Sequence, residues 1–255
     1  MIKKITEIFT EEEIVKSILR SGDETKVASL IADEEFIKKY ISLLLENEIA
    51  IDKICEAIEK ITSPEVLHII ASGVIKVEGD IDPLYKVLNN PHCSVETIMF
   101  VEEAFDRFWT DMCNSLKIDK KAYPKEKLMS IAEADKNGIC GIGIILFPAC
   151  DEELLYKILE NSKDEEADKY GYSEYSNMCG LALMRNYSLR EDVLEKCLES
   201  FLGCYGQDKS DIEYIVTSCD EVYLERVMAK IEENASEEIC KEARAAYAER
   251  KKGSK

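Results

Sequence analysis

The sequence predicts an all-α protein organised as a solenoid of short helices. Three observations predict this fold class. Helix-capping residues stand before apolar runs along the whole chain. No segment alternates polar and apolar residues over the length of a strand, and no Asn-Gly or Asp-Gly pair joins two strand-like runs. The helix starts also recur at a regular interval.

The first helix starts are well marked. Residues 10–13, Thr-Glu-Glu-Glu, form a capping box that opens a helix, and apolar residues at 14, 15, 18 and 19 share one face of it. Ser21-Gly22 ends this helix, and Asp33 begins another. Ser63-Pro64-Glu65 is a third start, with serine at the cap, proline at the first helical position and glutamate in the first turn.

Further starts follow along the chain. They stand at Ser94, at Pro124-Lys125-Glu126, at Asp151, at Ser188-Leu189-Arg190-Glu191 and at Asp220. The steps from Asp33 to Ser63, Ser94 and Lys125, and from Arg190 to Asp220, are each about 30 residues, a period typical of helical solenoids. This period is the length of two short helices with two turns.

Two local matches support a repeat. Cys140-Gly141-Ile142-Gly143-Ile144 matches Cys179-Gly180-Leu181-Ala182-Leu183 at a shift of 39, and Gly or Ala at these positions would let neighbouring helices approach closely. The segment 91–98 matches 148–155 at a shift of 57, with the common form Pro-x-Cys-(Ser or Asp)-x-Glu-x-apolar. In this form proline stops one helix and the small polar residue caps the next.

These motifs resemble a known group of proteins. The pattern Asn90-Pro91-x-x-Ser94-x-Glu96-x-Ile98, with a weaker echo at 186–194, is similar to the leucine-rich repeat variant and HEAT-like helical repeats of bacteria. The resemblance covers residues 60 to 230. It implies a right-handed α–α superhelix of short antiparallel helices that serves as a binding scaffold. It implies no functional residue, because these repeats specify packing.

We therefore expect a single helical-repeat domain over residues 1–255. Residues 1–60 would be N-terminal helices that either join the array or cap it, and residues 61–235 would be the repeat array. Residues 236–255 would form a C-terminal capping helix and tail, since a solenoid's last helix needs a polar outer face.

The composition and net charge limit the kinds of partner that this chain is expected to bind. The chain has 255 residues and a formal charge of −19, from 33 Lys and Arg against 52 Asp and Glu. The electric field of a chain with this negative charge repels polyanions, so we expect no nucleic acid and no membrane as partner. A basic protein is permitted as partner. The ten cysteines are evenly spread without a CxxC pair. Such cysteines are typical of free, buried thiols in a reducing cytoplasm.

One segment is a candidate partner-binding site. The step from Asp151 to Arg190 exceeds the basic period by about nine residues, as an insertion into one repeat of a solenoid would. The excess fits the polar stretch 162–177, and such an insertion commonly projects from the binding face. Tyrosines beside carboxylates there suit an interface, the alternatives being a solvated loop or tyrosines folded back on the solenoid. The candidate residues are Asp164, Glu165, Glu166, Asp168, Tyr170, Tyr172 and Tyr175.

The search for a catalytic or metal site gives no candidate. The two histidines, His68 and His92, lack ligands at metal spacing, and Cys93 beside His92 aligns with Cys150, which has no adjacent histidine. Packing is therefore the favoured role of Cys93. Trp109 with its aromatic neighbours in residues 104–109 is interpreted as an aromatic core between helices. We expect no metal, no cofactor and no catalytic residue.

Three functions remain open. The preferred hypothesis is a non-enzymatic cytoplasmic scaffold whose acidic surface recruits a basic protein. The first alternative is an acidic inhibitor of the immunity type, which neutralises a toxin or mimics nucleic acid and needs carboxylates concentrated on one surface. The second is an enzyme with a site assembled from distant residues, which would need a pocket holding His68, His92 or a cysteine with a perturbed pKa.

Overall fold

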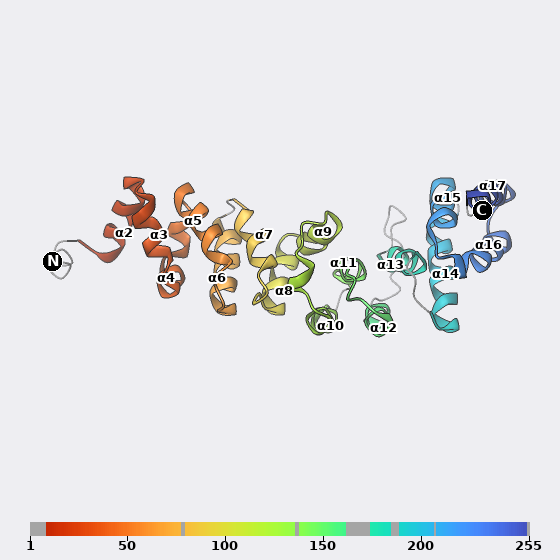
Figure 1. Cartoon of the computed structure of the whole chain (residues 1–255), viewed down its shortest axis with the longest axis horizontal. Helices are drawn as coiled ribbons and strands as arrows, with labels where there is room; N and C mark the ends of the chain where they lie inside the picture. Colours follow the sequence, from red (N-terminus) through yellow and green to blue (C-terminus); the bar gives the residue numbers. More distant parts are fainter. Residues whose placement is uncertain are drawn as a thin grey trace. The chain divides into compact units, whose positions relative to one another are not determined.

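A computed structural model shows an all-helical protein. It describes residues 9–77, 80–135, 138–161, 174–184, 189–206 and 208–253. These residues form sixteen α-helices, α2 to α17, and one 3-10 helix, and they contain no strand (Figure 1). The predicted all-α class is confirmed.

The contacts divide the chain into two units, residues 1–124 and 125–255. The first unit holds α2 (Glu11–Ser21), α3 (Glu24–Ile31), α4 (Glu34–Leu44), α5 (Glu48–Ile58), α6 (Pro64–Val77), α7 (Asp82–Asn89), α8 (Val95–Ala104), α9 (Phe108–Asn114) and η1 (Lys120–Ala122). The second holds α10 (Lys125–Ala134), α11 (Gly141–Ile145), α12 (Glu152–Asn161), α13 (Glu174–Leu183), α14 (Glu191–Tyr205), α15 (Lys209–Ser218), α16 (Glu221–Asn234) and α17 (Glu237–Gly253).

The helices of the first unit form two layers. α5 packs between α3 and α7, and α6 packs between α4 and α8. Figure 1 shows α3, α5, α7 and α9 along one side of this unit and α4, α6 and α8 along the other. The helices between residues 9 and 60 thus follow the same scheme as those after them.

In the second unit several alternate helices also pack together. α10 contacts α12, α11 contacts α13, and α15 contacts α17, while α14 contacts both α13 and α16. Sequential pairwise packing of this kind is consistent with a helical repeat. The prediction of one repeat domain over residues 1–255 stays a prediction.

The predicted helix starts mark one helix of each pair. Asp33, Ser63, Ser94, Asp151 and Asp220 directly precede α4, α6, α8, α12 and α16, and their side chains accept backbone N–H groups of the first turns. α10 begins at Lys125 as predicted. Ser188 lies outside the described residues, and α14 begins at Glu191. The capping box at Thr10 and the stop at Gly22, in the left-handed conformation, are also confirmed.

Side-chain contacts between repeats keep the predicted interval. Each of the following polar pairs joins positions 27 to 29 residues apart: Lys38–Glu65, Lys86–Glu59, His68–Thr97 and Lys209–Glu238. These contacts join α4 to α6, the end of α5 to α7, α6 to α8, and α15 to α17, which is consistent with a helical repeat.

The Asn-Pro motif forms a joint between two such pairs. Asn90 is 3 % exposed, and its amide donates to the carbonyl oxygens of Ile58 at 2.6 Å and Ile61 at 3.0 Å. Its own side-chain oxygen accepts the His92 N–H at 2.7 Å. Shortly after it, Ser94 caps α8. The motif thus links the end of α5 to the turn that starts α8.

The matched cysteines also lie at equivalent places. Cys93 and Cys150 are buried, and each directly precedes the cap of a helix, α8 or α12. Cys219 precedes the cap of α16 in the same way and is 1 % exposed. A buried apolar residue before the cap that packs near the first turn fixes the entry of the chain into a helix. The packing role predicted for Cys93 fits this position.

Glycines in the Cys-Gly match mark close helix contacts. A Cβ atom on Gly141 would lie 2.8 Å from Ile158 of α12 and closer still to the Met178 sulfur of α13. A Cβ atom on Gly180 would lie 2.8 Å from the Phe201 ring of α14. The expectation that these glycines allow close approach is confirmed. Gly203 of α14, by contrast, faces open space.

We therefore predict opposite effects for two glycine-to-alanine changes. Gly180→Ala should lower the free energy of unfolding by about 1 kcal/mol, because overpacking against Phe201 outweighs the helix propensity gained. Gly203→Ala should raise it by up to about 1 kcal/mol, because only propensity changes. Urea unfolding of both variants beside the wild type checks this, and equal shifts of the two midpoints would contradict it.

Two buried carboxylates cap helices that follow them. Glu102, near the end of α8, accepts the Trp109 N–H at 2.6 Å and the Thr110 hydroxyl at 2.5 Å, at the start of α9. Asp135, just after α10, accepts the Ile139 N–H at 3.1 Å and the Cys140 N–H at 2.7 Å, at the start of α11. Neither α9 nor α11 has a cap hydrogen bond from its own N-cap side chain.

Candidate functional site

Most of the predicted partner-binding residues fall outside the structure's described part. Asp164, Glu165, Glu166, Asp168, Tyr170 and Tyr172 lie there, so their role stays a prediction. Tyr175 is half-buried on α13 and hydrogen-bonds to the buried thiol of Cys179. The structure therefore gives no site geometry for this segment beyond Tyr175.

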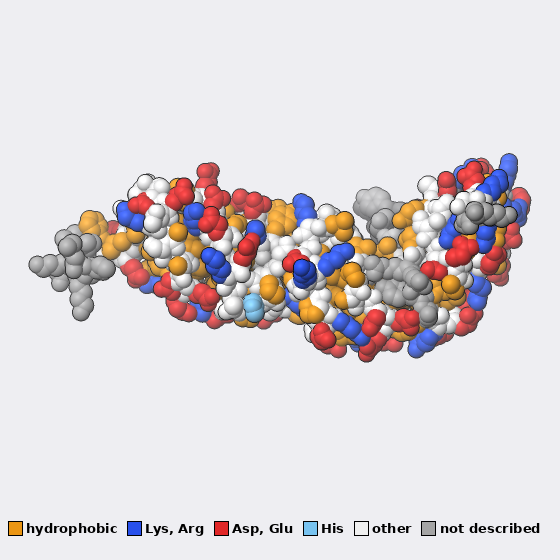
Figure 2. Space-filling view, viewed as in Figure 1, with side chains coloured by type: hydrophobic (Ala, Val, Ile, Leu, Met, Phe, Trp, Pro, Cys, Tyr) orange, Lys and Arg blue, Asp and Glu red, His pale blue; other side chains and the backbone are white. Residues whose placement is uncertain are grey.

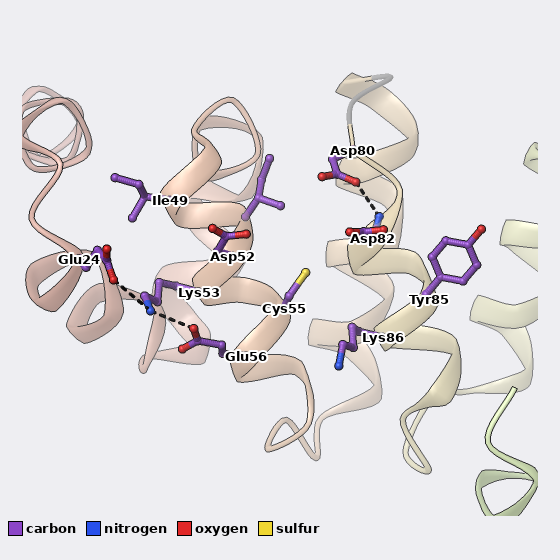
Figure 3. Close-up of a pocket in the computed structure, with 11 residues that line it drawn as sticks. Glu24, Ile49, Asp52, Lys53, Cys55, Glu56, Asp80, Asp82, Tyr85 and Lys86 are labelled. Atoms are coloured by element: carbon purple, nitrogen blue, oxygen red, sulfur yellow. Dashed lines mark hydrogen bonds and ion pairs between the residues drawn. The ribbon is translucent and has the colours of Figure 1, made fainter. Parts of the chain in front are cut away.

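The first unit contains a pocket of about 660 Å³ on α3, α5 and α7 (Figure 3). α3 contributes Glu24, and α5 contributes most of the wall. The remaining lining residues belong to α7 or directly precede it. This volume lies in the range of pockets that hold a ligand or a partner's side chains. A smaller hollow of about 290 Å³ shares Lys53 and Glu56 with it and continues along α3 and α5.

The pocket is acidic. Its lining includes the carboxylates of Glu24, Asp52, Glu56, Asp80 and Asp82, against two lysines. Lys53 lies 2.9 Å from Glu56 and 3.5 Å from Glu24, and its side chain is only 19 % exposed. Lys86 pairs outside the lining set, with Glu59 at 2.9 Å. The two lysines are thus already engaged by glutamates.

Three aspartates keep uncompensated charge. No cation in the described part of the chain forms an ion pair with Asp52, Asp80 or Asp82. Asp80 accepts the backbone N–H of Asp82 at 2.9 Å, which holds the Asp80 carboxylate at the start of α7. Figure 3 shows Asp52 on α5 and the other two near the start of α7. A cation entering this pocket would meet these three exposed carboxylates without displacing a resident lysine.

The pKa of the Cys55 thiol reflects the burial and the negative charge of the pocket. Burial and, to a smaller degree, the charges of Asp82 and Asp80 together raise the pKa of its thiol to about 11, against the opposing effect of Lys86. At neutral pH only about one such thiol in ten thousand is ionised. Because the thiolate is the reactive form, Cys55 is a weak nucleophile. A pocket with a perturbed cysteine therefore exists, but its shift opposes catalysis.

The effect of the nearby aspartates on Cys55 gives a testable prediction. The double variant Asp80→Asn/Asp82→Asn should lower the pKa of Cys55 and increase its alkylation rate at neutral pH, because two of the charges that oppose the thiolate are removed. Iodoacetamide labelling followed by peptide mass spectrometry measures the rate at this one cysteine. The control Glu46→Gln/Glu103→Gln removes two exposed charges outside the pocket lining and should leave the rate unchanged. An unchanged rate in the first variant would contradict the geometry.

The two histidines lie apart from this pocket. His68 is half-buried on α6, with its Nδ1 atom 3.1 Å from the Thr97 hydroxyl and its ring 5.1 Å from that of Phe100. His92 is exposed in the turn before α8. Among the described residues, no group of three or more His, Cys, Asp or Glu side chains is arranged to hold a metal ion. None of the described helices is both long and apolar enough to cross a membrane.

The aromatic segment 104–109 divides between core and surface. Trp109 is fully buried, and its ring lies 5.6 Å from that of Tyr123, as the predicted aromatic core requires. Phe105 instead is 38 % exposed, with its ring 5.7 Å from that of Phe108. The aromatic-core interpretation is therefore wrong for Phe105, because α8 ends at Ala104 and the chain turns there.

Comparison with protein-family models, curated proteins and solved structures gives no match to this chain. The choice of site therefore rests on the geometry of the pocket. The sequence did contain a signal for it that the motif search missed. Asp52 and Asp82 stand one repeat period apart, as do Cys55 and Tyr85, and Glu56 and Lys86. The pocket thus contains residues of α5 and α7 that are separated by the predicted period.

Proposed function

We propose that this chain is a non-enzymatic, cytoplasmic scaffold that binds a basic protein. In this proposal the helices form a right-handed solenoid of the HEAT-like kind, and the pocket on α3, α5 and α7 receives a lysine or arginine side chain of the partner. The observation that carries it is the set of Asp52, Asp80 and Asp82, which line a pocket without a cation of their own. A long cationic side chain matches the charge of this site and fits within its volume.

The alternative of a nucleic-acid mimic is less well supported. A mimic requires carboxylates concentrated on one surface. On the visible face of the first unit, Figure 2 shows Lys and Arg side chains among the Asp and Glu side chains. Lys38, for example, bridges Glu35 at 2.9 Å and Glu65 at 2.8 Å. This mixed pattern favours a surface with a local acidic site over a continuous acidic one.

Cysteine chemistry is consistent with the cytoplasmic part of the proposal. All ten cysteines are free thiols, and eight of them are buried. Free thiols persist in reducing compartments, and buried ones behave as small apolar side chains.

A defined peptide tests the binding proposal. The probe is a fluorescein-labelled synthetic peptide of alternating lysine and serine, with an aspartate and serine peptide as the opposite charge control. Fluorescence anisotropy with the full chain should show binding of the lysine peptide only, and the affinity should fall as salt is raised because exposed charges are screened. Binding of both peptides, or of neither, would overturn the proposal.

Matched variants locate the binding site. Asp52→Asn/Asp80→Asn/Asp82→Asn should weaken binding of the lysine peptide by about tenfold or more, because it removes the uncompensated charges. Glu46→Gln/Glu96→Gln/Glu103→Gln makes the same change in net charge at exposed positions outside the pocket lining. If both variants weaken binding equally, the pocket is not the site.

A further inference from the structure

Two buried thiols meet where α13 packs against α14. Cys179 of α13 and Cys197 of α14 are both fully buried, and a hydrogen bond joins their side chains. The two helices are in direct contact, and Gly180 allows a close approach beside the pair, since a Cβ atom on it would lie 2.8 Å from the Phe201 ring. The two sulfur atoms are thus neighbours in a tightly packed interface inside the second unit.

A polar network continues from this pair to a more exposed thiol. The Cys179 thiol also hydrogen-bonds to the side chain of Ser200. The Ser200 hydroxyl lies 2.8 Å from that of Ser176, and the Ser176 hydroxyl donates to the Cys204 sulfur at 3.1 Å. Cys204 is half-buried, whereas Ser176 is 1 % exposed. Cys204 is therefore the thiol of this network that solvent reaches.

Reach selects one pair among these three thiols. A disulfide requires two sulfur atoms about 2 Å apart on residues whose Cα atoms are no more than about 7 Å apart. Cys197 and Cys204 are both on α14, and the seven residues from one to the other span about 10 Å along the helix axis. The two serine hydroxyls lie between Cys204 and Cys179. Cys179 and Cys197, already in contact, need the smallest movement.

We propose that Cys179 and Cys197 are a redox-sensitive pair, whose oxidation by a peroxide locks α13 to α14 through a disulfide. Both S–H bonds break and one S–S bond forms. The two electrons and two protons released reduce one molecule of hydrogen peroxide to two molecules of water. Disulfides in reducing compartments are usually transient and redox-sensing, which suits a pair that is reduced until an oxidant arrives. This switch does not depend on the proposed binding of a basic protein.

The reduced pair is protected from weak oxidants. The hydrogen bond to Cys197 and burial hold the pKa of the Cys179 thiol well above its usual range. Because the thiolate is the reactive form, Cys179 should react slowly at neutral pH. We therefore expect the disulfide to form only at a peroxide dose that also oxidises the more accessible Cys204.

Disulfide mapping of the full chain tests the pair. The native protein is treated with hydrogen peroxide at a concentration that oxidises Cys204, and the remaining thiols are blocked with iodoacetamide. Peptide mass spectrometry after trypsin digestion should show the peptide of Cys179 linked to the peptide of Cys197. Oxidised Cys204 together with reduced Cys179 and Cys197 would overturn the inference.

Two variants assign the bond to its sulfur atoms. Trypsin leaves Cys197 and Cys204 on one peptide, because no lysine or arginine stands between them. The link to Cys179 should therefore persist in Cys204→Ser and disappear in Cys197→Ala. A link that is lost in Cys204→Ser would place the bond at that thiol instead, against the proposed pair.

Urea unfolding tests the lock. Oxidation should raise the unfolding midpoint, because a disulfide constrains the unfolded chain, and dithiothreitol should reverse the shift. Cys240→Ala changes another buried cysteine of the second unit and should keep the shift, whereas Cys197→Ala should lose it. A disulfide between Cys179 and Cys197 that leaves the midpoint unchanged or lowers it would show that the bond does not lock the two helices.

Discussion

Asn90→Ala is expected to lower the free energy of unfolding by about 2–4 kcal/mol. The asparagine amide donates to two carbonyl groups, those of Ile58 and Ile61, at a site where Asn90 itself is 3 % exposed. Alanine removes these bonds and leaves the Ile61 carbonyl without this donor, whereas the Ile58 carbonyl still accepts the Ile61 N–H at 3.1 Å. An unsatisfied buried group costs about 1–3 kcal/mol, and the lost bond to the His92 N–H adds to this. The effect is large because one side chain serves three backbone groups.

The neighbouring asparagine provides a matched control. Asn89 also joins two repeats, since it donates to the Lys117 carbonyl at 3.0 Å and accepts the Asp119 N–H at 2.6 Å. Its side chain is less buried, so water can replace these bonds, and Asn89→Ala should cost about 1 kcal/mol or less. Urea unfolding of both variants gives the comparison. A larger loss for Asn89→Ala would show that burial is not what makes Asn90 important.

The second large effect is expected at Glu102. Glu102→Ala should lower the free energy of unfolding by about 2–4 kcal/mol, because the start of α9 loses its acceptor inside the core. Glu102 is 1 % exposed and accepts hydrogen bonds from Trp109 and Thr110. Glu103→Ala, next in sequence and exposed, is the control and should be nearly neutral. Near-UV circular dichroism of Trp109 reports whether α9 alone is disturbed.

Glu102 should also give stability a pH dependence of definite sign. Burial raises the pKa of this carboxyl above its usual 4.5, against the opposing hydrogen bonds from Thr110 and Trp109. The native state therefore holds the proton more tightly than the unfolded state. The associated stability is fully present below the unfolded pKa and is lost as pH rises through the folded one.

Comparison with Glu102→Gln isolates this effect. Glutamine does not titrate, so the difference in unfolding free energy between wild type and variant should favour the wild type most at low pH and shrink as the pH rises from about 4.5. Urea titrations over this range measure the difference. A difference that grows with pH would contradict the raised pKa.

Sequence signals found one helix of each pair and missed several of the others. Asp33, Ser63, Ser94, Asp151 and Asp220 cap their helices locally, so a window of a few residues reveals them. The starts of α9 and α11 are capped by Glu102 and Asp135, which lie outside those helices. Neither carboxylate stands at the expected cap position, so local patterns do not predict them.

The candidate site likewise has one part that the sequence predicts and one part that it does not. The sequence predicts an insertion at 162–177 because the interval from Asp151 to Arg190 exceeds the predicted period. Apart from residues 174–177 this segment lies outside the described part of the chain, so the insertion stays a prediction. The pocket was missed because acidic residues are common in this composition. Asp52 and Asp82 can be assigned to one pocket only when α5 and α7 are known to lie side by side.

The sequence by itself determined the helical class, the starts of alternate helices and the glycines at close helix contacts. These depend on local caps, periodic apolar residues and side-chain size, which neighbours along the chain reveal. The tertiary structure decided which charges stay uncompensated, which carboxylates cap distant helices and which aromatic rings meet water. Those properties depend on distances between residues one repeat apart, because burial and charge compensation act through space.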